Sequence, residues 1–435
     1  MLEVPAHVHQ VQVEGAKQTR TSLIEAAIQP ALAARTFGEV TQAVHQACCR
    51  LEQLEVMEGF QVTMDTSRDP LAPEGSLDVV IRGKEKGRFW ARTGTEFGNS
   101  EGNAHTSATF RNVLGGGERV SISGSVGTRT RASNDITFTT PISANPNKVV
   151  DLSVFQQYQT FQTTSSHDQL FRGLNLRFKS NTPRFLSEVG YTALWRQMTD
   201  LGAQASPSIR QEGGHDVKSS VYFNLYNDQR DNPMLPTRGY LWRLNHELAG
   251  LAGLGGDVRF AKAEGQFQQC VPLAAGFHLT TSLRAGLIQP FDDSAAATTT
   301  SATRFPDRFL LGGPTSLRGF RPFGVGPRDH RDALGGDLYW ATGLSLFTPL
   351  PVIGVSSLKG HLWANAGGLS TLAKGTSPLQ TFTQSVSRPA SSVGCGLVFF
   401  HGMVRLELNM CLPVTISAWD QPRKGWQFGL GVDFI

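Results

Sequence analysis

The residues with the clearest capacity for specific chemistry lie in the segment LLGGPTSLRGF, which is rich in Gly, Pro and Ser. Arg318 stands there between Leu317 and Phe320, apolar neighbours that suit a buried position better than a solvated one. A guanidinium can meet a carboxylate through two parallel hydrogen bonds, so such a contact fixes direction as well as distance. Gly319, which lacks a Cβ, would let the backbone approach a wall closely. We therefore predict that these four residues, the lock motif, hold a loop in place.

Nothing in the sequence indicates catalysis or metal binding. His215 and Asp216 are adjacent but have no placed nucleophile, and the runs GLGG and LGGG lack the lysine and helix of a phosphate-binding loop. The five cysteines match no zinc-binding spacing. The formal net charge of +4 over 435 residues is too small to indicate nucleic-acid binding. We expect no enzyme activity, no cofactor, no metal site and no nucleic-acid partner.

The composition differs from that of an ordinary soluble domain. Charged residues make up 17% of the chain, below the roughly 25% usual in soluble domains. No stretch approaches 18 apolar residues without a charge, so no transmembrane helix is predicted. The opening residues, MLEVPAHVHQ, lack the basic region and apolar core of a secretory signal, so none is expected.

Residues 1–86 are predicted to form a small α+β domain. HVHQVQVEG alternates apolar and polar residues as a strand does. Two segments with helical spacing follow, TRTSLIEAAIQPALAA and TFGEVTQAVHQACCRLEQL. FQVTMDT and LDVVIRGKEK are then predicted as strands. The order strand, helix, helix, strand, strand is large enough to bury one core.

After Gly87 the helical spacing ends and a period of two residues takes over. In MVRLELNMCL one face carries Val404, Leu406, Leu408, Met410 and Leu412, and the other carries Arg405, Glu407, Asn409 and Cys411. The final segment, GWQFGLGVDFI, alternates in the same way. The signal is weak in each segment but recurs along the chain, as expected for a transmembrane β-barrel.

Sixteen strands are predicted between the turn clusters, and an even number is the rule for single-chain bacterial barrels. They lie near residues 87–98, 103–114, 119–129, 135–141, 149–159, 169–179, 184–197, 216–228, 238–249, 258–272, 277–289, 336–348, 358–368, 391–400, 403–415 and 425–435. Connections from even to odd strands are mostly short, and those from odd to even strands are mostly longer. The small domain therefore shares the tight rim, and the loop 291–335 with the lock motif starts at the other rim. The predicted fold class is mainly β, a 16-stranded antiparallel transmembrane β-barrel over 87–435 preceded by the small domain.

A β-sandwich would also alternate apolar and polar residues, with its polar face outward. Two details favour the membrane barrel. Charged residues such as Arg284, Arg405 and Glu407 lie at mid-strand on the polar face, where a wet lumen tolerates them. Aromatic residues such as Trp340 and Trp426 lie near strand ends on the apolar face, where interfacial girdles occur.

Four segments in chain order resemble the Omp85 superfamily: LLGGPTSLRGF, GGDLYWATGLSLFTPLP, RLELNMCLP and GWQFGLGVDF. DQRDNPMLPTRG, at the end of the eighth predicted strand, is a further match. More narrowly, the chain resembles the branch that forms the central barrel of the mitochondrial sorting and assembly machinery. Its N-terminal domain resembles a single POTRA module, and WANAG places Asn365 where bacterial relatives usually carry an acid.

This resemblance implies an insertase for β-barrel precursors in the mitochondrial outer membrane, with the N-terminal domain in the intermembrane space. The implied partners are the precursors, metaxin-like peripheral subunits of the machinery, the inner-membrane cristae-organising complex and membrane lipid. An incoming strand cannot enter hydrocarbon with unpaired backbone groups. A barrel that opens between its first and last strands offers an edge on which that strand can pair. A passive diffusion pore, and a bacterial or plastid channel for protein secretion or import, are the alternatives.

The last predicted strand has features that suit such a lateral gate. Glycines weaken a strand interior or mark close backbone approach, and this strand contains three, Gly425, Gly429 and Gly431. The alternative is that these glycines only make room for the loop with the lock motif. QFGLGVDF also fits the C-terminal sorting pattern of the family's clients, whose set positions are occupied by Gln427, Gly429, Val432 and Phe434.

The loop with the lock motif is predicted to fold into the lumen, against the twelfth to fourteenth strands. Asp337 and Tyr339 share the polar face at the start of the twelfth strand. Asp337 is therefore the expected partner of Arg318, with Asn365 on the thirteenth strand as a neutral second choice.

Overall fold

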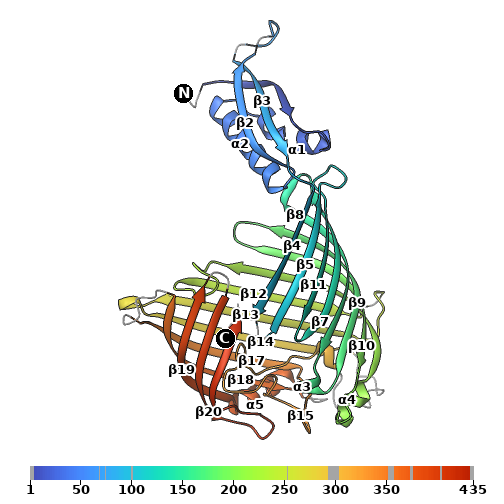
Figure 1. Ribbon diagram of the computed structural model, residues 1–435, viewed down its shortest axis with the longest axis vertical. Coiled ribbons are helices and arrows are strands. Elements are labelled where there is room, and N and C mark those ends of the chain that lie inside the picture. The colour runs from blue at the N-terminus through green and yellow to red at the C-terminus, as the bar shows by residue number, and fades with distance from the viewer. Residues whose placement is uncertain are drawn as a thin grey trace.

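The computed structural model describes residues 4–67, 69–73, 75–98, 101–251, 253–291, 303–350, 357–372, 376–401 and 404–431. These residues form a three-stranded sheet, a sixteen-stranded sheet and a two-stranded ladder within a loop. The small sheet and its helices stand at one end of the molecule, and the large sheet makes up most of the rest (Figure 1).

The N-terminal domain has the predicted order of elements: β1 (His7–Glu14), α1 (Thr21–Leu32), α2 (Phe37–Gln53), β2 (Met57–Thr66) and β3 (Ser76–Glu85). Helix α2 is capped by Thr36, whose hydroxyl accepts from the Glu39 backbone N–H, and the Glu39 carboxylate accepts from the N–H of Arg35, one residue before the cap. Its buried stripe packs on the sheet, and that stripe consists of Val40, Val44, Ala47, Cys48 and Leu51. The strand order is β1-β3-β2, so β1 and β2 are the edges.

The large sheet contains sixteen strands, each antiparallel to its neighbours, as predicted. They are β4 (Phe89–Gly98), β5 (Glu101–Arg111), β6 (Arg119–Gly127), β7 (Thr130–Ile142), β8 (Asn145–Thr160), β9 (Asp168–Asn181), β10 (Leu186–Thr199), β11 (Gly214–Asp228), β12 (Gly239–Ala249), β13 (Phe260–Pro272), β14 (His278–Pro290), β17 (Leu338–Pro349), β18 (Leu358–Ser370), β19 (Ala390–His401), β20 (Val404–Thr415) and β21 (Gly425–Gly431).

The face of each strand that is buried distinguishes a membrane barrel from a β-sandwich. On β20 the exposed residues are Leu408, Met410 and Leu412, and the buried ones are Arg405, Glu407, Asn409 and Cys411. A sandwich would bury the apolar face and expose the polar one. The sheet instead exposes its apolar face and turns its polar face inward, as a barrel in lipid requires.

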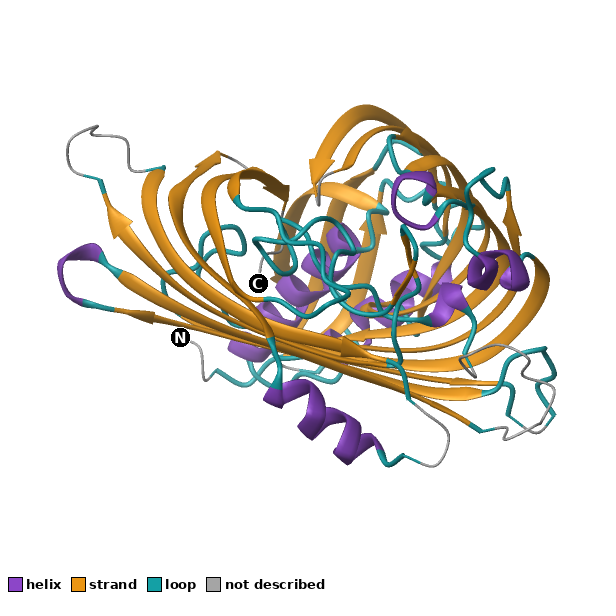
Figure 2. Cartoon of the chain, turned by 90° about the horizontal axis from the view of Figure 1, so that it is seen from below, coloured by secondary structure: helices purple, strands orange, loops and turns teal. Residues whose placement is uncertain are grey.

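The sheet curves around a set of loops and short helices (Figure 2). The hydrogen-bonded order runs from β21 at one end to β4 at the other. The two end strands lie beside each other. Among the described residues, however, no backbone ladder joins β4 to β21, so the cylinder has a seam there.

Short helices in the loops are absent from the sequence prediction. They are α3 (Gln162–Ser165), α4 (Pro207–Glu212) and α5 (Pro378–Ser387), with 3-10 turns η1 (Ala274–Gly276) and η2 (Phe305–Asp307). Helices α4 and α5 each begin at a Ser-Pro pair, where the serine hydroxyl caps the helix and proline occupies the first turn. In the part of the chain that the structure describes, no helix is long and apolar enough to cross a bilayer.

The N-terminal domain docks on the barrel rim that carries the short turns. Glu55, just after α2, accepts from Arg111 Nε at 2.9 Å, and Lys86 and Arg119 lie within 3.9 Å of its carboxylate. Asn112, in the turn after β5, donates to the Thr19 hydroxyl at 3.0 Å. The Glu55 carboxylate therefore gathers cations from both the barrel and the chain that links the two sheets.

Replacing Glu55 with glutamine is expected to loosen this docking, because one carboxylate serves all three cations. Spin labels at Gln46 on α2 and Arg184 on the rim should report a broader distance distribution in Glu55→Gln than in the parent chain. Glu58→Gln, an exposed acid three residues away, is the matched control. A distribution unchanged by Glu55→Gln would show that other contacts set the orientation.

Candidate functional site

The long connection between β14 and β17 folds back inside the curved sheet. Of the predicted loop 291–335, residues 292–302 lie outside the described part, and the lock loop is defined here as residues 303–337. It contains a two-stranded ladder, β15 (Arg328–Asp329) with β16 (Asp332–Ala333). Its apolar side chains join wall residues in one buried cluster, whose loop members are Phe309, Leu311, Leu317, Phe320, Val325. The lock loop therefore gives the lumen a hydrophobic core.

Arg318 is buried in this lumen with 1% of its surface exposed. Its Nε donates to Glu407 Oε2 at 3.0 Å, and its Nη2 lies 2.9 Å from the same oxygen. The ring of Trp363 lies beneath the guanidinium, 5.5 Å from Cζ to the ring centre. The predicted burial of Arg318 and its partnership with a carboxylate are thus both found, but the carboxylate belongs to β20.

Glu407 is fully buried and is bound on both sides. Asn409 Nδ2 donates to its Oε2 at 2.8 Å, and Arg405 contacts its Oε1. The carboxylate is therefore shared by two guanidinium groups, and either arginine alone would leave part of it unsatisfied. An ion pair buried this deeply is strongly destabilised when one partner is removed.

The prediction that Arg318 pairs with Asp337 is wrong. Asp337 lies just before β17 and accepts from the Thr303 hydroxyl and, at 3.0 Å, from the Leu372 N–H. It thus ties the two ends of the lock loop to the next long loop at the rim. Arg318 reaches deeper into the lumen, where Glu407 is the acidic residue at the same depth.

The other two predicted wall residues lie near the lock loop but contact different parts of it. Tyr339 packs against Phe309, with 4.6 Å between ring centres, and its hydroxyl bonds to Glu264. Asn365 Oδ1 lies 2.7 Å from the Ser392 hydroxyl, which also contacts the Arg318 carbonyl. Asn365 is therefore connected to the lock motif through Ser392.

Gly319 is required by both conformation and space. Its φ is +82°, and a Cβ at this position would lie 2.8 Å from Ser392. Its N–H donates to Gln427 Oε1 at 3.0 Å, and Gln427 Nε2 donates to the Phe320 carbonyl at 3.0 Å. The lock motif is thereby fastened to β19, β20 and β21. The predicted wall, the twelfth to fourteenth strands β17–β19, includes β19 and the Trp363 ring of β18, but the contacts with β20 and β21 were not predicted.

The residues predicted to belong to the lateral gate lie in different environments. Gln427 is buried and binds the lock motif, and Gly429 is also on the buried face, opposite Glu407. Gly431 pairs with Arg405, while Val432 and Phe434 lie outside the described residues. A Cβ at Gly425 would meet no atom within 4 Å, so this glycine does not make room for the lock motif.

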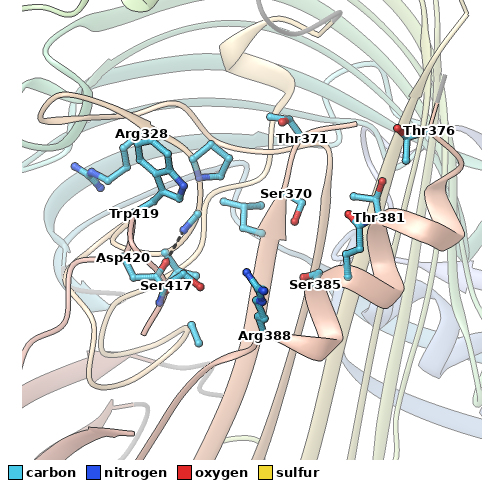
Figure 3. A pocket seen from close by; sticks show the side chains of 17 residues that line it. Arg328, Ser370, Thr371, Thr376, Thr381, Ser385, Arg388, Ser417, Trp419 and Asp420 are labelled. Atoms are coloured by element: carbon cyan, nitrogen blue, oxygen red, sulfur yellow. Dashed lines mark hydrogen bonds between the residues drawn. The ribbon is translucent and has the colours of Figure 1, made fainter. Parts of the chain in front are cut away.

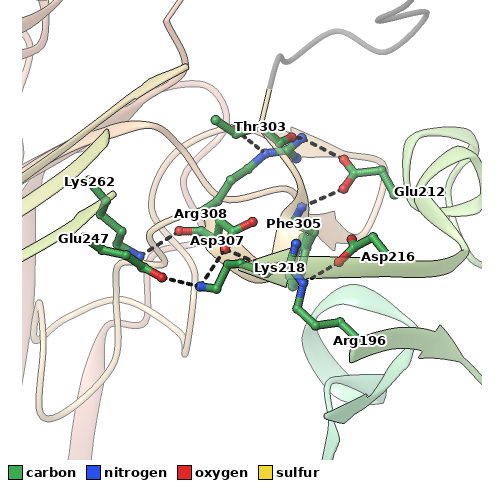
Figure 4. A network of polar contacts seen from close by, with 10 residues as sticks. All are labelled: Arg196, Glu212, Asp216, Lys218, Glu247, Lys262, Thr303, Phe305, Asp307 and Arg308. Atoms are coloured by element: carbon green, nitrogen blue, oxygen red, sulfur yellow. Dashed lines mark hydrogen bonds and ion pairs between the residues drawn. The ribbon is translucent and has the colours of Figure 1, made fainter. Parts of the chain in front are cut away.

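A second polar cluster, which the sequence analysis missed, holds the start of the lock loop (Figure 4). Asp307 Oδ1 lies 2.7 Å from Arg196 Nη1 and 3.2 Å from Lys218 Nζ, and Lys262 Nζ donates to the Asp307 carbonyl at 2.8 Å. Burial alone would raise the pKa of the Asp307 carboxyl, but Arg196 and Lys218 outweigh it and hold that pKa below its usual value. The stability from this ionised carboxylate is present at neutral pH and is lost only as pH falls through the lowered pKa.

Helix α4 extends the same cluster. Arg308 Nη2 lies 2.7 Å from Glu212 Oε1, and the other carboxylate oxygen accepts from the Phe305 N–H at 2.6 Å. The lock loop is thus fastened to β10, β11, β13 and α4 at its start, and to β19–β21 at the lock motif.

A turn from the rim that bears the N-terminal domain reaches the same lumen. The segment 229–238, between β11 and β12, belongs to the motif DQRDNPMLPTRG. Leu235 is buried against Phe347 and Val398, and the Met234 carbonyl accepts from Arg405 Nη1 at 3.1 Å. Arg405 therefore links this turn to Glu407.

Comparison with known proteins shows to which class of proteins a chain with this fold and this lumen loop belongs. The profile of the Omp85 superfamily domain matches residues 112–434, so the chain belongs to the Omp85 superfamily. In structure it is similar to BamA from Haemophilus ducreyi lacking POTRA domains 1-3, with a TM-score of 0.78 and 17% identity over 97% of this chain and 84% of that one.

Particular relatives are found in fungi and animals. The SAM50-like protein of Schizosaccharomyces pombe is 36% identical, with 99% of this chain and 91% of the relative covered. The sorting and assembly machinery component 50 homolog of mouse is 33% identical, with 99% and 90% covered. The chain is thus similar to the component 50 proteins over almost its whole length.

Proposed function

We propose that the chain inserts and assembles β-barrel precursor proteins in the mitochondrial outer membrane. Support comes from membership of the Omp85 superfamily and from similarity to component 50 of the sorting and assembly machinery. The observation that carries the mechanism is the seam, where β4 and β21 lie side by side at the two ends of the hydrogen-bonded sheet.

The seam provides the lateral gate in this proposal. Sheet edges are normally hidden because unpaired N–H and C=O groups recruit other strands. In hydrocarbon each unpaired group costs several kcal/mol, so a precursor strand must pair as it enters. Parting β4 from β21 exposes two edges at once, and the incoming strand adds to one of them.

The lock motif positions the strands beside this gate. Gln427 on β21 and Glu407 on β20 hold the lock motif, while Arg196 and Lys218 on the opposite wall hold Asp307. The lock loop thus connects the wall beside the seam to a wall that lies seven or more strands away in the sheet order. Movement of β20 and β21 during insertion has to be accommodated through these contacts.

The lumen contents argue against a passive diffusion pore. A pore requires an open water-filled channel, whereas the lock loop brings a buried apolar cluster into the lumen. A bacterial or plastid channel is disfavoured because this chain and its component 50 relatives align with each other over at least 90% of their lengths.

The partners follow from the same proposal: precursor proteins at the seam and the N-terminal domain, and metaxin-like subunits of the machinery. Contact with the inner-membrane cristae-organising complex is assigned to the N-terminal domain, which is placed in the intermembrane space. The exposed edge of β2 is available there for strand addition.

Protease added to intact mitochondria is expected to spare the N-terminal domain, because the rim on which it docks faces inward in this orientation. Rupture of the outer membrane should make the same domain cleavable, which is read out with an antibody to residues 1–86. Cleavage in intact mitochondria would reverse the proposed orientation.

The function itself is tested by depletion and replacement. Mitochondria from cells that lack their own component 50 protein should regain assembly of an imported, radiolabelled β-barrel precursor when this chain is expressed. Assembly is followed by native gel electrophoresis, with a matrix-targeted precursor as the control for general import. A chain present in the outer membrane that restores no assembly would overturn the proposal.

A further inference from the structure

Helix α5 lies on the outside of the barrel, at the lower edge of Figure 2, where it contacts β17 and β18. Trp340 Nε1 on β17 donates to the Ser385 hydroxyl of α5 at 3.0 Å. Trp340 is 9% exposed, whereas Leu344, on the same outward face, is 47% exposed. The helix therefore covers part of the face that is elsewhere bare and apolar.

Two stripes of residues run along α5. The apolar stripe is exposed and points away from the barrel: Leu379, Phe382 and Val386, of which Leu379 is 74% exposed. The polar stripe, Thr381, Gln384 and Ser385, has the i, i+3, i+4 spacing of a single helix face, and Arg388, the residue at which the helix ends, lines the same pocket. The helix contains no acidic residue.

The polar stripe faces a pocket of about 660 Å³ at the rim (Figure 3). The pocket lies between α5, the end of β18, the lock loop near Arg328, and the segment around Trp419. Arg388 extends into it below Ser370, and hydroxyl groups of Thr381 and Ser385 line the side formed by the helix. Trp419, at the opposite side, is 63% exposed.

We propose that α5 lies in the headgroup region of the bilayer and that this pocket takes the phosphate headgroup of a phospholipid. The apolar stripe continues the lipid-facing surface of β17–β19, so acyl chains would cover both. Exposed tryptophan is typical of the same interfacial depth. The arginine and hydroxyls then face the headgroups, where a phosphate oxygen can accept from Arg388.

The depth of α5 can be measured in the full chain reconstituted in phosphatidylcholine and phosphatidylethanolamine vesicles. In a background with Cys49→Ser and Cys395→Ser, a nitrobenzoxadiazole fluorophore is attached at Phe382→Cys or, as the control, at Gln380→Cys. At position 382 we expect quenching by nitroxide-bearing lipid and protection from iodide, and at 380 the reverse. Equal iodide quenching at both positions would place the helix in water. Protection from both quenchers at 382 would mean that protein covers it, and either result overturns the proposal.

The headgroup site is tested by crosslinking to a phospholipid that carries a photoreactive headgroup. Arg388→Gln should lower the yield about fivefold, because the phosphate loses a charged donor that lines the pocket itself. Lys424→Gln, an exposed cation on the loop between β20 and β21, is the matched control and should leave the yield unchanged. Equal yields for the parent chain and Arg388→Gln would remove the headgroup site. Neither measurement uses precursor assembly, so the outcome is independent of the proposed insertase function.

Discussion

Precursor insertion is expected to stop when the seam is closed by a disulfide. Cysteines are introduced in pairs along Phe89–Thr95 of β4 and Gly425–Leu430 of β21, leaving Gln427 unchanged because it holds the lock motif. The pair that oxidises to completion should reduce assembly of an imported precursor by at least about tenfold, equivalent to about 1.4 kcal/mol or more on the barrier. The reason is that no edge is exposed while both end strands are joined.

The matched control is a disulfide that joins two neighbouring strands of the sheet, β4 and β5, and leaves the seam unlinked. Thr93 and Thr106 face each other across β4 and β5, and joining them leaves both end strands free to part. This variant should assemble precursors at the parent rate, as should the seam variant after reduction. Undiminished insertion through a fully oxidised seam would exclude the lateral gate between β4 and β21.

Loss of the buried ion pair is the second change with a large expected effect. In Glu407→Gln two guanidinium groups, Arg318 and Arg405, lose their shared carboxylate inside the lumen. Removing one partner of a buried pair costs about 3–5 kcal/mol. The lock motif can avoid that cost by leaving its site, so we expect the barrel to remain in the membrane while the lock loop becomes accessible to protease and precursor assembly slows.

Substitutions of the arginine separate charge from geometry. Arg318→Ala should reproduce the slow assembly of Glu407→Gln, and Arg318→Lys should rescue it poorly, because lysine cannot approach one carboxylate with two nitrogens of a planar group. Arg321→Ala, three residues along the same loop and exposed, should assemble precursors normally. The proposed role of the lock would be refuted by full activity of Arg318→Ala with the lock loop still protected.

The barrel could be predicted because its signal is local. An alternation of apolar and polar residues specifies which side of each strand faces lipid, whatever strands stand beside it. Helix α2 could be predicted for the same reason, since its apolar stripe and its cap both lie within one short segment. Helices α4 and α5 carry Ser-Pro caps that could have been found, but their short apolar patterns are weak within long loops.

The neighbours of Arg318 were enough to predict that it is buried and paired with an acid, since Leu317 and Phe320 flank it and an unpaired buried charge is too costly. Its neighbours could not show whether the partner is Asp337 or Glu407. Both carboxylates lie on inward positions, and which one meets the arginine depends on how deeply the lock loop descends and against which strands. That depth is set by contacts far apart in the chain, Gln427 with Gly319 and Arg196 with Asp307, which no local pattern encodes.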